Sequence, residues 1–346
     1  MRREAATVDR SLINENNELV SYSDVYGIKK RIAAGGAFYN AAMNRRLAAQ
    51  GLLAALAAAG LAGCQTPPTA PPPAATPPVE PAAPHKPLRL PRIGLALGGG
   101  AARGFAHIGV IQVLEEAGIR PDLVVGTSAG SLVAALYASG KSGAELAKLA
   151  LAMDESAITD WSFPGRGLIR GEALARYVRE QTGNRLIEQL PLPLGIVATD
   201  LDSGAAALFQ RGDTGAAVRA SSAVPAVFQP VKIGAREYVD GGLVSPVPVR
   251  FARQMGAELV LAVDITSPPD GAATGDPFKM LLQTFAIMGR SINVFELKEA
   301  DVVVRPRLLG VSSADFTARK KAIDSGREAA LLMLPALRAK LALLSR

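Results

Sequence analysis

A serine stands between two glycines in the run Gly126-Thr127-Ser128-Ala129-Gly130, a G-x-S-x-G pattern. A short apolar run, residues 123–125, precedes the pattern, and a second run with helical character, residues 132–136, follows it. In a strand–turn–helix context such a serine lies on a sharp turn with its hydroxyl exposed, and the glycines leave room for crowded backbone. The free N–H groups at the start of the helix can stabilise an oxyanion. The pattern therefore indicates a nucleophilic serine that attacks acyl groups.

A nucleophilic serine needs a base, and this chain contains only two histidines. Both precede Ser128, whereas the histidine of an α/β-hydrolase triad follows the serine along the chain. His85 lies in a proline-rich segment, where we expect it to be solvated. His107 falls on the first predicted helix, and we interpret it as a residue that supports the site rather than as the base. A carboxylate is the remaining candidate.

Four aspartates stand at or just after predicted strands: Asp200, Asp202, Asp240 and Asp264. Asp240 is favoured because two glycines follow it, Gly241 and Gly242, which let a neighbouring backbone approach and aim the carboxylate out of the sheet. Asp200 and Asp202 are also explained as part of a polar turn, and Asp264 is also explained as the end of a strand, without a catalytic role. Partial desolvation and a hydrogen bond to the serine hydroxyl would make an aspartate an adequate base.

A glycine-rich turn leads from the first predicted strand into the first helix through Gly98, Gly99, Gly100, Ala101, Ala102, Arg103 and Gly104. A P-loop would have lysine after its last glycine, where this chain has Phe105. A dinucleotide fingerprint would have an acid at the end of the next strand, but Asp122 begins that strand. What remains is a loop whose amides can face the oxyanion. Arg103 would add charge for a phosphate head group, and an exposed helix arginine explains it equally well.

These motifs, in this order between Ile93 and Asp264, resemble the patatin-like phospholipase family. The segments 198–201, 220–228 and 240–248 are also similar to that family. The resemblance implies an α/β fold with three α/β/α layers around a mostly parallel central sheet. It also implies that a Ser128–Asp240 dyad hydrolyses lipid acyl esters without a metal or any other cofactor.

The resemblance assigns roles to the glycine motifs as well. It implies that the oxyanion donors are backbone amides around Gly99, Gly100, Ala101 and Ala129. It also implies that Gly126 and Gly130 shape the turn that carries the nucleophilic serine, and that Gly241 and Gly242 shape the motif that carries the base. The loop has one residue more before Arg103 than the commonest form in the family, a variant that looks like the bacterial subgroup.

Two other functions are compatible with parts of this pattern. A thioesterase or acyltransferase with the same dyad would pass the acyl group from Ser128 to a different acceptor. A non-catalytic lipid-binding lipoprotein would use the fold as a binding module, although the retention of Ser128 and Asp240 argues against it. We expect lipid acyl esters or phospholipids and a membrane as partners. The net charge of +7 fits an anionic surface and is too diffuse to indicate nucleic acid.

The elements that must position these residues alternate along the chain. Strands are predicted at 93–97, 122–126, 194–199, 206–210, 236–239, 259–265 and 302–304, and helices at 103–117, 129–139, 172–181, 247–255, 278–297 and 314–344. This alternation predicts a mostly parallel sheet with helices on both faces. We assign 92–310 to the patatin-like domain, 311–346 to a C-terminal helix packed on it, and 267–277 to a mobile flap.

The N-terminal quarter has a different composition. Residues 1–42 are polar and predict a poorly ordered extension, or an artefact of start-site choice. Residues 43–63 have the arginines, the apolar stretch and the small residues of a secretory signal peptide. The apolar stretch is shorter than the roughly 20 residues that span a bilayer. Residues 64–91 form a proline-rich tether, which favours an extended conformation.

The signal ends in Leu61-Ala62-Gly63-Cys64, which resembles the bacterial lipobox. In a lipobox the cysteine receives diacylglycerol and becomes the mature N-terminus. An Ala/Leu helix that contains one cysteine is the alternative. Cys64 is the single cysteine of the chain, which excludes a disulfide framework. Because Gln65 stands where an inner-membrane retention signal usually has Asp, we expect a lipid-anchored protein of the bacterial cell envelope, at the outer membrane and facing the periplasm.

Overall fold

A computed structural model describes residues 89–154, 158, 160–161, 166–266, 277–311 and 316–345. The predicted N-terminal extension, signal peptide, lipobox with Cys64 and most of the proline-rich tether lie outside these residues. Nearly all of the predicted flap, 267–276, lies outside them as well.

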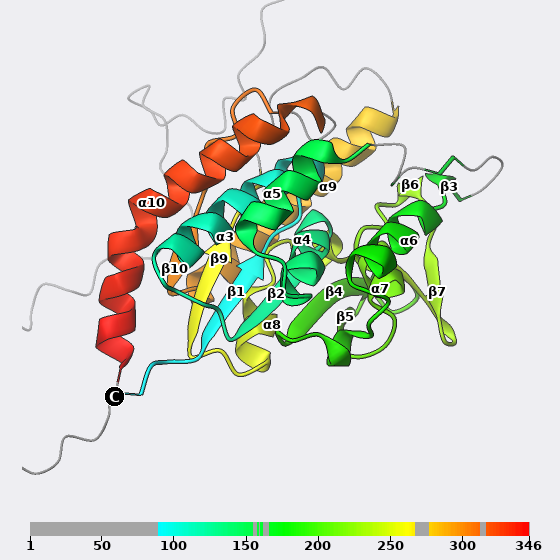
Figure 1. Ribbon diagram of the computed structural model, residues 1–346. Coiled ribbons are helices and arrows are strands. Elements are labelled where there is room, and N and C mark those ends of the chain that lie inside the picture. The colour runs from blue at the N-terminus through cyan, green and yellow to red at the C-terminus, as the bar shows by residue number, and fades with distance from the viewer. Residues whose placement is uncertain are drawn as a thin grey trace, which may run out of the picture. The chain divides into compact units, whose positions relative to one another are not determined.

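Within the described residues, an eight-stranded sheet forms the centre of the domain (Figure 1). Its strand order is β10-β9-β1-β2-β4-β8-β7, and β5 pairs with β4 off this path. The bounds are β1 Ile93–Leu97, β2 Leu123–Thr127, β4 Leu194–Asp200, β5 Ala206–Phe209, β7 Val231–Ile233, β8 Arg236–Asp240, β9 Leu259–Val263 and β10 Val302–Val304. The strands from β10 to β4 pair in parallel, and β5, β7 and β8 are antiparallel. The predicted mostly parallel sheet is confirmed.

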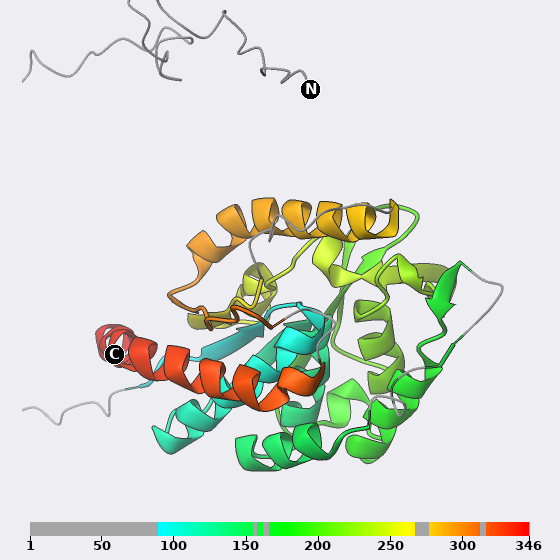
Figure 2. The ribbon, with the colours of Figure 1, turned by 90° about the horizontal axis from the view of Figure 1, so that it is seen from above.

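Helices cover both faces of this sheet, as predicted (Figure 2). One face carries α3 (Ala106–Glu116), α4 (Ala129–Ala138), α5 (Gly143–Ala152) and α10 (Arg319–Leu344). The opposite layer holds α8 (Val249–Gln254) and α9 (Pro277–Glu296). Helices α6 (Glu172–Gln181) and α7 (Thr214–Ser221) pack on each other beside β4 and β8. The molecule is a three-layer α/β/α domain.

The apolar sequence runs explain why the central strands form. Every residue of β1 and of β2 is buried, as expected for parallel strands covered on both faces. Alternate side chains enter two separate cores: Leu95 and Val124 pack under α3 and α4, whereas Ala96 and Val125 pack under α8. Because β1 and β2 run parallel, their carboxyl ends lie at the same edge of the sheet, where the loops that follow them meet.

Several short elements were not predicted. Helices α5 and α7 are absent from the sequence expectations, as are β7 and the small two-stranded sheet of β3 (Gly167–Ile169) and β6 (Ala226–Phe228). Both missed helices begin at a polar side chain that caps the first turn, Ser142 for α5 and Asp213 for α7. No helix within the described ranges is long and apolar enough to cross a membrane.

Candidate active site

Ser128 lies on the turn between β2 and α4, at φ 53° and ψ −124°. This left-handed backbone conformation is rare for a residue with a side chain and is typical of strained functional turns. The turn needs glycine on both sides of the serine. A Cβ on Gly130 would lie 2.1 Å from the carbonyl oxygen of Leu97, and one on Gly126 would lie 2.4 Å from the carbonyl oxygen of Gly130. The close approach of these backbones fixes the turn and presents the serine at its apex.

Asp240 is the last residue of β8 and is nine-tenths buried. The Asp240 amide donates to the carbonyl oxygen of Ala223 at 3.0 Å, and the Asp240 carbonyl oxygen accepts the hydroxyl of Thr199 at 2.8 Å. The carboxylate accepts the Gly242 amide at 2.7 Å and is hydrogen-bonded to the Ser128 side chain. The structure thus brings together the two residues that the sequence singled out as nucleophile and base.

The environment of Asp240 suits it to accept a proton. Burial raises the pKa of its carboxyl from 3.8 to about 6, against the opposing effect of hydrogen bonds from Gly242 and Ser128. A carboxyl with an ordinary pKa is a weak base toward a serine hydroxyl, and desolvation strengthens it. This pKa leaves the group ionised at neutral pH while keeping its proton affinity high.

The glycine loop lies directly against the serine turn, but not all of its amides are free. The Gly98 amide donates to the Val263 carbonyl oxygen at 3.1 Å, and the Gly99 amide donates to the Pro246 carbonyl oxygen at 2.9 Å. The expectation that Gly99 supplies an oxyanion donor is therefore wrong. These two bonds tie the loop to the end of β9 and to the segment after β8, so that the loop is held rigidly.

The remaining predicted donors are Gly100, Ala101 and Ala129. Within the described residues, the amides of Gly100 and Ala101 donate no hydrogen bond. Ala101 has a φ of 50° and begins a short 3-10 helix, Ala101–Phe105. Ala129 is the first residue of α4, where the amide has no partner within the helix. These three amides are available to an oxyanion formed next to Ser128.

The structure also shows what Arg103, Gly104, Gly241 and Gly242 contribute to the shape of the site. Gly104 and Gly241 permit close packing: a Cβ on Gly104 would lie 2.8 Å from that of Ala129, and a Cβ on Gly241 would lie 2.2 Å from the Val197 carbonyl oxygen. Gly242 donates its amide to the carboxylate of Asp240. The Arg103 Nε donates to the carbonyl oxygen of Gly100 at 3.3 Å, so that this side chain braces the loop.

His107 supports the same loop from beneath. It is completely buried on α3, and its Nε2 lies 2.8 Å from the carbonyl oxygen of Gly98. Burial lowers the pKa of His107 to about 4, so the ring is neutral at pH 7. Because a carbonyl oxygen only accepts, Nε2 carries the proton and donates it to Gly98. This geometry agrees with the interpretation of His107 as a supporting residue.

Two supports of the serine turn were missed at the level of sequence. The Ser128 amide donates to the Ser221 hydroxyl oxygen at 2.8 Å, and Ser221 donates in turn to the Val197 carbonyl oxygen. The Ser221-Ser222 pair within the family-like segment 220–228 was a signal that could have suggested this role. The amide of Ser128 is consequently not an oxyanion donor.

The second support is a chain of hydrogen bonds from β2 to α9. The Thr127 hydroxyl donates to the Ser245 carbonyl oxygen at 2.8 Å, and the Ser245 hydroxyl donates to the carboxylate of Glu296. Burial raises the pKa of Glu296 to about 7. No sequence pattern indicated Glu296, because its partner lies 51 residues away along the chain.

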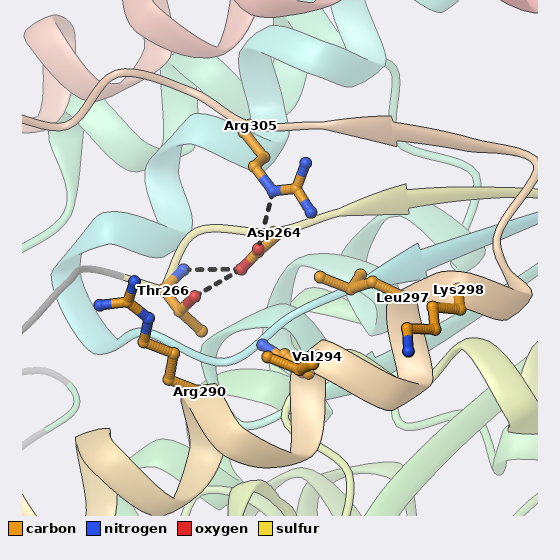
Figure 3. A pocket seen from close by; sticks show the side chains of 8 residues that line it. Asp264, Thr266, Arg290, Val294, Leu297, Lys298 and Arg305 are labelled. Atoms are coloured by element: carbon orange, nitrogen blue, oxygen red, sulfur yellow. Dashed lines mark hydrogen bonds and ion pairs between the residues drawn. The ribbon is translucent and has the colours of Figure 1, made fainter. Parts of the chain in front are cut away.

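None of the other candidate aspartates forms a hydrogen bond with Ser128 in the described part of the chain. Asp200 forms an ion pair with Arg236 and accepts amides of its own turn. Asp202 lies exposed in that turn. Asp264 follows β9, where it pairs with Arg305 and accepts the Thr266 hydroxyl at the edge of a separate cavity (Figure 3). The turn and strand-end explanations of these residues fit the structure.

Comparison with known proteins agrees with this geometry. Residues 95–253, which contain the glycine loop, the serine turn and the base motif, match the family model described as patatin-like phospholipase. This stretch is similar to patatin-like phospholipase domains. Its β1, β2, β4 and β8 form the core of the sheet described above, and the fold is the patatin-like α/β fold.

Curated relatives share about half of the chain. An uncharacterized NTE family protein of Mycobacterium tuberculosis is 40% identical over 186 residues, which cover 53% of this chain and 51% of the relative. Patatin-like phospholipase domain-containing protein 6 of Mus musculus is 37% identical over 184 residues, 51% of this chain and 14% of the relative. The chain thus spans about half or less of the length of these relatives.

Among solved structures, the crystal structure of VipD from Legionella pneumophila is similar to this chain. It covers 70% of this chain and 66% of its own, with a TM-score of 0.48 and 16% sequence identity.

Proposed function

We propose that this protein is a serine lipid acyl hydrolase, an esterase of the phospholipase A type. The observation that carries the proposal is the hydrogen bond between Ser128, strained at the apex of its turn, and the buried carboxylate of Asp240. Three free amides beside the serine and the match to patatin-like phospholipases support it. Lipid esters are proposed as substrates because the matching family is named for phospholipases.

The reaction follows from the positions of these groups. The Ser128 oxygen attacks the ester carbonyl while its proton passes to the Asp240 carboxylate. The negative charge on the carbonyl oxygen is stabilised by the amides of Gly100 and Ala101 in the glycine loop and of Ala129 at the start of α4. The C–O bond to the leaving alcohol breaks, and that alcohol takes the proton from Asp240. Water then attacks the acyl-serine in the same way, releases the fatty acid and restores both residues.

The experiment compares the protein with its Ser128→Ala variant on a p-nitrophenyl acyl ester and on phospholipid vesicles. We expect ester turnover and labelling by a fluorophosphonate to be lost in the variant, with circular dichroism unchanged because the serine lies on a turn. Labelling that survives the substitution would place the nucleophile elsewhere. Absence of turnover by the unmodified protein would favour the binding module, and acyl transfer to an added alcohol or amine in preference to water would favour the acyltransferase.

We also propose that the domain is anchored to the bacterial cell envelope through Cys64, at the outer membrane. The support is the sequence alone: the arginines, the apolar stretch, the lipobox-like end and the tether that follows it. Two or three acyl chains anchor a protein stably where one chain is marginal.

Anchoring is tested with Cys64→Ala. We expect this variant to leave the membrane fraction, or to accumulate as an unprocessed precursor, while its esterase activity is retained. A processed chain that still sediments with membranes would contradict anchoring through Cys64.

A further inference from the structure

Helix α9 turns an apolar stripe to solvent. Its exposed large side chains recur at intervals of seven residues, in two adjacent rows: Met280, Leu281, Ile287, Met288, Val294 and Phe295. Phe295 is 70% exposed and Val294 is 56% exposed. A row with this spacing follows one side of a helix over most of its length, about 22 Å from Met280 to Phe295. The exposed Thr284 and Ser291 lie between the two rows, and their hydroxyls donate to helix carbonyl oxygens, so that this side of α9 offers mainly apolar surface to a partner.

The opposite side of α9 faces the domain. Gly289, Asn293 and Glu296 are buried there, and Glu296 accepts the hydroxyl of Ser245. The helix also packs on the short turn Gly241–Leu243, which directly follows the base Asp240. Figure 2 shows α9 along one edge of the molecule, in the layer opposite to α10. The apolar stripe therefore belongs to the outer surface beside the candidate active site.

A basic cavity adjoins this stripe (Figure 3). It has a volume of about 410 Å³ and is bounded by Asp264, Thr266, Arg290, Asn293, Val294, Leu297, Lys298 and Arg305. Three of these side chains are cationic and one is anionic, so positive charge is in excess. Within the described residues, Arg290 forms no ion pair or hydrogen bond. Lys298 lies over the ring of Phe295, 5.2 Å from its centroid, and so joins the cavity to the stripe.

The cavity contains a buried polar group without a partner. Asn293 is only 4% exposed, and both its amide nitrogen and its amide oxygen lack a hydrogen bond. A buried amide in this state costs free energy unless a ligand or water satisfies it. Two N–H donors beside free cations suit an anionic oxygen such as that of a phosphate.

We infer that α9 docks the protein on the surface of a bilayer that contains anionic phospholipid. The stripe from Met280 to Phe295 enters the boundary between head groups and acyl chains, as amphipathic interfacial helices do. The cavity with Arg290, Asn293 and Lys298 receives a lipid phosphate. This inference depends on the proposed function only in that docking would deliver a lipid ester to Ser128. The contact is separate from the acyl chains proposed at Cys64.

The single cysteine of the chain makes a site-specific test available. Full-length Cys64→Ala contains no cysteine, so that Met288→Cys introduces one on the stripe and Leu332→Cys introduces one on α10, which is exposed in the opposite layer. Each protein is labelled with an environment-sensitive nitrobenzoxadiazole dye and mixed with phosphatidylcholine vesicles, with or without phosphatidylglycerol. We expect a blue shift, and quenching by nitroxide-labelled lipid, at position 288 on the anionic vesicles and not at position 332.

Charge variants in the labelled Met288→Cys background test the cavity. Arg290→Ala and Lys298→Ala should each weaken vesicle binding about fivefold, because a basic residue near an anionic bilayer contributes roughly 1 kcal/mol. Asn293→Leu should also weaken binding to anionic vesicles. Arg338→Ala removes the same charge from α10, which lies on the other side of the sheet from the stripe, and should leave vesicle binding unchanged. The losses should diminish at high salt, where the charges are screened.

The inference is overturned if the dye at position 288 stays in water on anionic vesicles. It is also overturned if the dye shifts without lipid as protein concentration rises, since the stripe would then be an interface between two copies of the chain. Equal effects of Arg290→Ala and Arg338→Ala on vesicle binding would contradict the assignment of the lipid phosphate to the cavity. Ser128→Ala leaves all these readouts in place, so that failure of docking and failure of catalysis are distinguished.

Discussion

Asp200 and Asp240 lie on paired antiparallel strands yet have opposite environments. In the register of β4 and β8, Asp240 is opposite Ala198, and Asp200 is opposite Tyr238. Asp200 pairs with the guanidinium of Arg236 and accepts amides of the following turn, which lowers the pKa of its carboxyl to about 2. Asp240 has no cation among its hydrogen-bond partners in the described residues, and burial raises its pKa to about 6.

The neighbours of a carboxylate, more than its place in the sheet, determine what it can do. An arginine beside Asp200 stabilises the charge and leaves a weak base that holds a turn together. Without such a partner, the charge on Asp240 is costly, so the carboxylate has a raised affinity for a proton. Of these two aspartates, 40 positions apart in the same pair of strands, Asp200 stabilises a turn and Asp240 is suited to the proposed proton transfer.

The comparison is tested most strongly by removing each charge in turn. Asp240→Asn keeps the side-chain shape and removes the base, and we expect kcat to fall about 10²–10⁴-fold. Asp200→Asn should leave kcat within about twofold, because Asp200 touches neither Ser128 nor the free amides. Initial rates on a p-nitrophenyl ester measure both. Similar losses in the two variants would show that the loss comes from the fold rather than from a base.

The pH dependence of the reaction should follow the raised pKa of Asp240. The carboxylate must be ionised to accept the serine proton, so kcat/KM should rise with pH and level off above about 6. Below that value the rate should fall roughly tenfold per pH unit. Release of p-nitrophenol can be followed at its isosbestic wavelength, and Asp200→Asn should give the same profile. A rate that stays flat down to the ordinary range of an aspartate would mean that Asp240 is not desolvated during catalysis.

Much of this site follows from sequence because local patterns encode it. Apolar runs before and after the serine give β2 and α4, and glycines on both sides of Ser128 indicate the tight turn. The positions of proline and glycine in the sequence do not reveal which backbone amides already donate a hydrogen bond within the protein. Gly99 looks like a donor in the sequence, and only the packing of the loop against Pro246 shows that its N–H is engaged.

Contacts between distant segments account for the rest. Ser221 and Glu296 support the serine turn from elements far along the chain, and no spacing rule connects them to it. The sequence predicts a helix over residues 278–297, but it does not tell which side of that helix faces the domain. That depends on Gly289 and Asn293 packing inward, a tertiary property.

Stability should respond to the two aspartates with opposite signs, beginning with Asp240. A pKa raised from 3.8 to about 6 means that the folded state binds the proton more tightly, so this group lowers stability as pH rises from about 4 to 6. Asp240→Asn removes that cost and can still accept the Gly242 amide. We expect the variant to be more stable than the unmodified protein at pH 8, by up to about 3 kcal/mol, and equal to it near pH 4.

The smallest effect expected is that of Asp200→Asn on the same measurement. Its pKa is lowered to about 2, so the ionised group stabilises the fold above its unfolded pKa near 4, and this contribution is lost as pH falls through 2. The variant should melt below the unmodified protein at pH 8, and the difference should shrink toward pH 2. Arg236 is largely exposed, so solvent screens the pair and the loss should be modest. Thermal melts of both variants across pH measure the two signs together, and a destabilised Asp240→Asn at pH 8 would contradict the proposed desolvation of the base.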